Sequence, residues 1–236
     1  MLTPTPFQPI PPTATITPPP TPTLTFTPQP TLTETMKPTD TDSPEPPEAE
    51  TTAPEEDESF ASVTVPILLY HHISDTIDTQ YNVRPEIFAA QMKWLHDNGY
   101  QTVTIADVAS AIRKNKSLPN RPVVITFDDG YLDVYQNAYP VMQEYDYVAT
   151  FYIIANTVDT RKNLSTKKLL NLIQSGWEIG SHSMTHADLN ENDQWETEII
   201  DSKNLLEEKL GVKIETFAYP YGLAKPSVIA YTIDSG

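Results

Sequence analysis

Residues 123–130 read VVITFDDG, an apolar run that stops abruptly at two acids and a glycine. Residues 177–186 read WEIGSHSMTH, so a second run ends at a histidine that is followed by another four residues later. Short apolar runs bounded by polar residues are typical of buried strands. We therefore expect two strand ends that deliver two carboxylates and two imidazoles to one place.

From residue 61 onwards, apolar runs alternate with segments that have helical spacing of apolar residues. We expect strands at 65–70, 123–127, 149–154, 177–181 and 216–219, and helices at 85–98, 105–116, 132–145, 165–176, 193–210 and 227–233. This alternation predicts an α/β fold with a parallel sheet covered by helices. A barrel is favoured over an open sheet, because no Gly-rich phosphate loop follows the first strand. Residues 233–236 read as a helix end leading towards a further strand, so we expect the barrel to lack its last strand.

Residues 1–60 are rich in Thr and Pro and end in an acidic segment, EEDE at 55–58. Such a segment has little to bury, so we expect a disordered linker with extended, polyproline-like conformers. Residues 61–236 are long enough for one domain with a sizeable core. The formal charge of −17 divides almost evenly between the two parts. An acidic domain without a basic stripe is a poor nucleic-acid binder.

The cellular location has to be inferred from composition. The absence of cysteine excludes disulfides and thiolate metal sites. No stretch approaches the roughly 20 apolar residues of a membrane span, and no signal peptide is visible after Met1. Thr/Pro-rich stalks are nevertheless typical of exported proteins, so we expect an extracellular or envelope-attached domain. The alternative is a cytoplasmic protein with a disordered tail.

Four polar clusters fall at the C-terminal ends of the expected strands, where barrels of this class carry their active sites. They are His71-His72, Asp128-Asp129, His182 and residues 219–222. Imidazoles such as His182 and His186 suit Zn²⁺, and one carboxylate completes a three-ligand site that keeps a position open for water. The second carboxylate is then free to accept a proton. Adjacent strand residues point to opposite faces, but Gly130 permits a sharp turn that aims both acids at one cavity.

The motifs TFDDG at 126–130 and HSMTH at 182–186 resemble the first two motifs of the polysaccharide deacetylase family. This is the NodB-homology domain of carbohydrate esterase family 4. Residues 217–222 (FAYPYG) resemble its third motif, and the similarity extends from about Pro66 to the end of the chain. The resemblance implies a distorted (β/α) barrel that removes acetyl groups from N-acetylglucosamine units of glycans, with one divalent ion, most often Zn²⁺.

The resemblance also implies a role for individual residues. Asp128 becomes the catalytic base, and Asp129, His182 and His186 become metal ligands. The third motif supplies substrate contacts at Tyr219, Pro220 and Tyr221. The Tyr221 N–H helps to hold the oxyanion, where charge develops only in the transition state.

Two features of the family pattern are missing. Ala218 stands where most members have an Arg that pairs with the base, and the late motifs, one of which supplies the general acid, are absent. A branch that resembles the poly-N-acetylglucosamine deacetylases also lacks this Arg and has a Tyr-His after its first strand, as Tyr70-His71 does here. This resemblance implies His71 as the general acid, with His72 as the alternative.

We therefore expect a monomeric, metal-dependent N-deacetylase of poly-N-acetylglucosamine, peptidoglycan or a chitin-like polymer. Two alternatives stay open. One is a non-catalytic glycan-binding or wall-associated module, which the missing Arg would favour. The other is a related deacetylase that acts on acetyl-xylan or a small amide.

Overall fold

The computed structural model describes residues 64–113 and 116–236. The predicted linker at 1–60 lies outside these residues. The strands are β1 Ile67–Tyr70, β2 His72–Ile73, β3 Asn82–Val83, β4 Gln101–Val103, β5 Pro122–Phe127, β6 Thr150–Ile153 and β7 Glu178–Ser181. The α-helices are α1 Pro85–Asp97, α2 Ile105–Ile112, α3 Tyr139–Gln143, α4 Thr166–Gln174, α5 Ser202–Leu210 and α6 Pro226–Asp234. Wider π-helical turns form η1 Val134–Ala138 and η3 Glu196–Asp201, and tighter 3₁₀ turns form η2 Ala155–Thr157 and η4 Pro220–Gly222.

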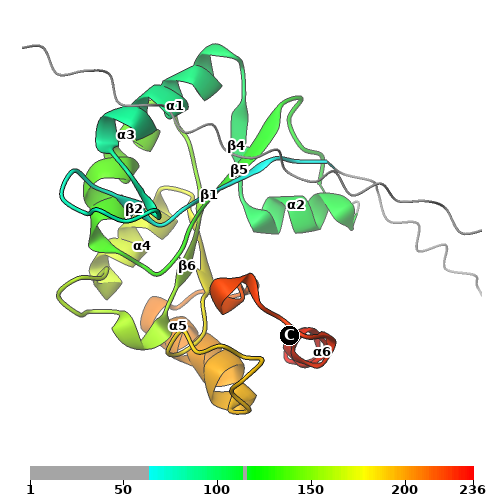
Figure 1. Cartoon of the computed structure of the whole chain (residues 1–236). Coiled ribbons are helices and arrows are strands. Elements are labelled where there is room, and N and C mark those ends of the chain that lie inside the picture. The colour runs from blue at the N-terminus through cyan, green and yellow to red at the C-terminus, as the bar shows by residue number, and fades with distance from the viewer. Residues whose placement is uncertain (1–63, 114–115) are drawn as a thin grey trace, which may run out of the picture. The chain divides into compact units, whose positions relative to one another are not determined.

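The main sheet is parallel throughout. β5 lies between β1 and β6, β6 pairs with β7, and β4 pairs with the first half of β5. A bridge between Ser181 and Phe217 continues the sheet beyond β7. Figure 1 shows α1, α3 and α4 stacked along one side of these strands. The prediction of an α/β fold with a parallel sheet is confirmed, and the carboxyl ends of β1, β5 and β7 therefore meet at one edge.

An aromatic cluster lies beneath this edge. Phe127 ends β5 and is fully buried, as is Phe151 on β6. The Phe127 ring stacks on that of Trp177, with centroids 5.6 Å apart and planes at 9°, and lies 5.7 Å from that of Phe151. Such aromatic pairs add about 0.5–1.5 kcal/mol beyond the area that they bury. The cluster therefore fixes the direction in which β5 presents the acids that follow it.

The predicted strand at 216–219 is wrong in extent. This segment makes only the single bridge at Phe217, because Pro220 has no N–H for a ladder and the chain turns there into η4. Gly180 explains why the segment still approaches β7 closely: a Cβ on Gly180 would lie 2.7 Å from Thr216 Oγ1. The expectation of a further strand after residue 236 stays a prediction.

Other differences concern features without a periodic signal. The short strands β2, β3 and β4 were not predicted, since two or three residues show no alternation that could be recognised. The helices predicted at 132–145 and 193–210 begin as η1 and η3, a hydrogen-bond register that apolar spacing does not reveal. Within the described ranges, no helix combines the length and the apolar character needed to cross a bilayer.

Candidate metal centre

Asp128 and Asp129 follow β5 directly and are both buried, at 8% exposure each. The turn begins one residue earlier than predicted, because Asp129 itself is left-handed, with φ 71°, as is Gly130, with φ 77°. This backbone turns both carboxylates towards His182. Asp128 Oδ2 lies 3.9 Å and Asp129 Oδ1 3.6 Å from His182 Nε2.

His182 is held by its other ring nitrogen. Its ring is buried at the end of β7, and Nδ1 lies 2.8 Å from the carbonyl oxygen of Ala218. A carbonyl only accepts, so Nδ1 carries the proton and donates it to Ala218 O, which leaves the Nε2 lone pair facing the carboxylates. Metal-binding histidines are typically oriented by such a bond from the second nitrogen.

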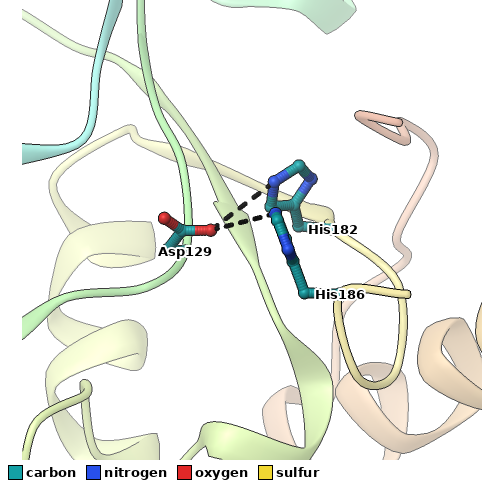
Figure 2. A group of neighbouring side chains, drawn as sticks. All are labelled: Asp129, His182 and His186. Atoms are coloured by element: carbon teal, nitrogen blue, oxygen red, sulfur yellow. Dashed lines mark ion pairs between the residues drawn. The ribbon is translucent and has the colours of Figure 1, made fainter. Parts of the chain in front are cut away.

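His186 reaches the same point from the following loop. Its backbone is left-handed, with φ 65°, and its N–H donates to Ser183 Oγ at 2.9 Å. Its Nε2 lies 3.5 Å from Asp129 Oδ1. Figure 2 shows this oxygen of Asp129 facing a ring nitrogen of both histidines.

Asp129, His182 and His186 fit a divalent ion. One ligand atom from each can be chosen so that all lie within 4.8 Å of one another. A tetrahedral site with bonds of about 2.0–2.1 Å places ligand atoms roughly 3.4 Å apart, close to the two Asp129–histidine separations. Asp129 Oδ1 is buried and has no hydrogen-bond partner among the described residues. A buried oxygen without a donor is costly, and a cation at this point would satisfy it.

Burial changes the protonation of this centre. It raises the pKa of Asp128 to about 7, to which the neighbouring charge of Asp129 contributes. Burial also lowers the pKa of His182 well below its ordinary value. His182 is therefore neutral and able to bind a metal at neutral pH. A cation beside Asp128 would favour its charged form, and so would make it available as a base.

The third motif contributes mainly backbone. Tyr221 is left-handed, with φ 61°, and its side chain is 65% exposed beside the ring of His186, at 4.5 Å between centroids. Pro220 is buried and Tyr219 packs against Phe217. With Asp129, Ser183 and His186, Tyr221 belongs to a group of non-glycine residues with positive φ around this centre. Strained backbone of this kind concentrates at functional sites.

The two histidines after β1 differ in their surroundings. His72 Nδ1 lies 2.7 Å from Asp133 Oδ2, and its ring stacks on Tyr131 at 3.7 Å. Among the described residues, no hydrogen bond involves the His71 ring, which packs 5.1 Å from the ring of Tyr81. Burial lowers the pKa of His71, while the charge of Asp129 acts in the opposite direction. Of the two, only His72 is therefore held by a hydrogen bond of its ring to a side chain of the described residues.

Asp133 is a residue that the sequence did not point to. Its carboxylate also accepts the N–H of Ile73 at 3.1 Å, so it ties β2 to the start of η1. It lies 61 residues from His72 in sequence, and an acid at the start of a helix has no distinctive local signature. Ala218 stands where an Arg was expected from the sequence; its backbone carbonyl contacts His182, and no Lys or Arg of the described residues pairs with Asp128.

Fold and site together define a parallel α/β protein with a centre of one carboxylate and two imidazoles beside a second buried carboxylate. The sequence profile described as polysaccharide deacetylase matches residues 115–236. The chain belongs to the polysaccharide deacetylase family, and its fold is the distorted barrel of that family.

Individual relatives show how far the similarity extends. The Bacillus subtilis protein YxkH is 38% identical over 160 residues, which are 67% of this chain and 57% of that protein. A Staphylococcus aureus poly-beta-1,6-N-acetyl-D-glucosamine N-deacetylase is 30% identical over 171 residues, covering 66% of this chain and 59% of the enzyme. The chain therefore spans less than two thirds of these curated relatives.

Solved structures of other proteins are also similar to the fold of this chain. The Streptococcus pyogenes deacetylase PplD, determined in complex with acetate, superposes with a TM-score of 0.70 at 29% identity, covering 74% of this chain and 81% of that one. IcaB from Ammonifex degensii superposes with a TM-score of 0.63 at 26% identity, covering 73% and 80%.

Proposed function

We propose that this chain is a metal-dependent hydrolase that removes N-acetyl groups from a polysaccharide containing N-acetylglucosamine. The observation that carries the proposal is the buried carboxylate of Asp128, whose Oδ1 has no hydrogen-bond partner among the described residues, next to the cluster of Asp129, His182 and His186. One carboxylate for a metal and one for a proton suit metal-assisted hydrolysis of an amide. The named activity of the Staphylococcus aureus relative favours poly-N-acetylglucosamine over peptidoglycan or a chitin-like polymer.

Asp129, His182 and His186 would hold the ion, and two imidazoles with one carboxylate suit Zn²⁺. When bound, Zn²⁺ supplies Lewis acidity to the acetyl carbonyl and to the attacking water. Asp128 accepts the proton of that water, and the Tyr221 N–H donates to the oxyanion as the carbonyl becomes tetrahedral. His71 then gives a proton to the leaving amine as the carbon–nitrogen bond breaks, which yields acetate and a free amino group.

Two exposed aromatic rings support a glycan as the substrate. Tyr81 is 56% exposed and packs against His71, and Tyr221 is exposed beside His186. Large exposed rings beside a polar centre offer faces on which sugar rings can stack. Both rings adjoin histidines of the candidate site, so they offer stacking faces where a glycan would have to bind.

The direct test measures acetate release from an N-acetylglucosamine oligomer by the full chain with added Zn²⁺. We expect acetate in proportion to the amines formed, and none after treatment with a chelator. Acetyl-xylan and N-acetylglucosamine monomer serve as comparison substrates. Faster release from acetyl-xylan would replace the substrate class, and tight Zn²⁺ and glycan binding without any acetate would identify a non-catalytic binding module instead.

His71→Ala tests the assignment of the general acid. We expect a fall in kcat of about 10²-fold or more, because general acid catalysis contributes about 10²–10⁴-fold. The loss should be smaller for an activated ester, whose leaving group needs no proton. His96→Ala is the matched control, since His96 is an exposed histidine on α1. Equal losses on amide and ester would contradict this role for His71.

The domain organisation, the location and the oligomeric state are part of the same proposal. Residues 61–236 would form the catalytic domain, and residues 1–60 a disordered Thr/Pro-rich linker that gives it reach from an extracellular or envelope attachment. The substrate would then be a polymer outside the cell, and the enzyme would act as a monomer. Small-angle scattering of the full chain and localisation of a tagged chain in cells would test these points.

A further inference from the structure

The loop at residues 183–186, which carries His186, has an unusual backbone conformation. Ser183 and His186 both have positive φ, at 65° each, so the loop is strained at two of its residues. Strained backbone persists only where its surroundings hold it in place. The contacts of this loop therefore decide whether the His186 ring stays near Asp129.

One residue outside the loop makes several of these contacts. Glu198 on η3 accepts the N–H of Thr185 at 2.9 Å with Oε2 and its hydroxyl at 2.6 Å with Oε1. The backbone carbonyl of Glu198 also accepts the N–H of Met184 at 3.0 Å. Glu198 thus accepts hydrogen bonds from two successive N–H groups of the loop, those of Met184 and Thr185. The next N–H, that of His186, donates to Ser183 Oγ.

Glu198 is unusual among the acids of this chain. It is 2% exposed, and no Lys, Arg or His of the described residues lies within ion-pair distance of it. Acids are almost never buried unless they are paired, and each carboxylate oxygen here accepts a hydrogen bond from the loop. The π-helical turn that carries Glu198 is a rare geometry that recurs at functional sites.

We infer that Glu198 is a positioning residue that locks the 183–186 loop and thereby sets the affinity of the centre formed by Asp129, His182 and His186. The inference rests on the metal site of the proposed function. Outer-shell groups of metal sites typically contribute 10–100-fold to metal affinity. Glu198 does not contact a metal ligand directly; it holds Thr185, the residue before His186, and so acts through the backbone of the loop.

The test measures Zn²⁺ affinity by competition and the absorption spectrum of the Co²⁺-loaded full chain. Glu198→Ala should weaken Zn²⁺ binding by about 10–100-fold and alter the Co²⁺ bands, since the geometry around His186 relaxes. Glu198→Gln should stay within about threefold of the wild type. Its amide oxygen can accept the Thr185 N–H, and its NH₂ can donate to the Thr185 hydroxyl oxygen. Thr185→Val, which removes only the hydroxyl, should fall between these two.

Controls separate positioning from plain stability. Glu196→Ala changes an exposed glutamate on the same turn and should alter neither readout. A Glu198→Ala protein with a lower Tm but unchanged Zn²⁺ affinity and Co²⁺ spectrum would overturn the inference. If Glu198→Ala does not fold, Thr185→Val decides in its place, because Thr185 is exposed and its hydroxyl is dispensable for the core. A wild type that binds neither ion would instead refute the metal site itself, and one that binds but releases no acetate would refute only the activity.

Discussion

Asp128→Asn is expected to lower the rate of acetate release by about 10²–10⁴-fold, the usual contribution of a general base. The amide keeps the shape of the side chain but has no lone pair basic enough to take a proton from water. Asp129, His182 and His186 are unchanged, so Zn²⁺ affinity should stay within a few-fold of the wild type. The measurement pairs a kcat determination with a Zn²⁺ titration of the same preparation.

The same substitution should stabilise the metal-free protein at alkaline pH. Burial raises the pKa of Asp128 from 3.8 to about 7. Because the pKa of Asp128 is raised on folding, its contribution to stability is fully present below the unfolded pKa of 3.8. That contribution is lost as the pH rises through the folded pKa of about 7. The corresponding cost of the buried charge at pH 8 is at most about 4 kcal/mol, and Asn avoids it. We therefore expect a higher Tm for Asp128→Asn at pH 8, without metal, and little difference at pH 4.

Asp193→Asn provides the control, because Asp193 is exposed in the loop before η3. It should leave the rate, the metal affinity and the Tm unchanged. Undiminished acetate release by Asp128→Asn would remove Asp128 from the mechanism. A Tm that falls at pH 8 would show that the Asp128 charge is not buried at a cost.

The absent Arg has a structural consequence for this base. No cation among the described residues lies beside Asp128, and its Oδ1 has no hydrogen-bond partner there. Burial therefore acts on this carboxylate without the compensation that a guanidinium would give. The charge of a bound metal is then the main influence that could keep Asp128 ionised at neutral pH. Activity should accordingly begin to decline at a higher pH than in a relative that retains the Arg.

That the residues of the candidate metal centre lie together could be predicted from the sequence, because they come in two local pairs. Asp128 and Asp129 end one apolar run, and His182 and His186 follow another. The carboxyl ends of parallel strands lie at one edge of the sheet. The two pairs were therefore expected at the same edge without knowledge of the strand order. What the sequence did not reveal is the turn itself: the left-handed residue is Asp129, where Gly130 alone had been expected to provide the turn.

The supporting contacts could not be predicted, because they join residues without a shared pattern. The proton of His182 is placed by the carbonyl of Ala218, a backbone group that no side-chain motif encodes. Asp133 and Glu198 resemble any acid on an amphipathic helix until the fold places them against His72 and Thr185. The strand predicted at 216–219 shrank to one bridge for a related reason, since its length depends on the turn at Pro220.

His186→Ala is expected to abolish Zn²⁺ binding at micromolar concentrations and acetate release with it. The loss of a ligand should exceed the 10–100-fold effect of an outer-shell change, because only two of the three ligand groups remain. His186 is a better choice than His182, whose buried ring also bonds to Ala218 and supports the third motif. The Tm of the metal-free protein should therefore change little in His186→Ala.

The decisive comparison uses metal as the variable. Wild-type protein is treated with a chelator, dialysed and titrated with Zn²⁺, and acetate release should recover in step with the ion bound. His186→Ala should need at least 100-fold more Zn²⁺ for any recovery, whereas His96→Ala should follow the wild type, since His96 lies exposed on α1. Full activity of the chelated wild type would show that the carboxylate and the two imidazoles serve some purpose other than holding a catalytic ion. The separations of 3.6 and 3.5 Å from Asp129 Oδ1 to the two rings would then be contacts between closely packed polar groups that hold no ion.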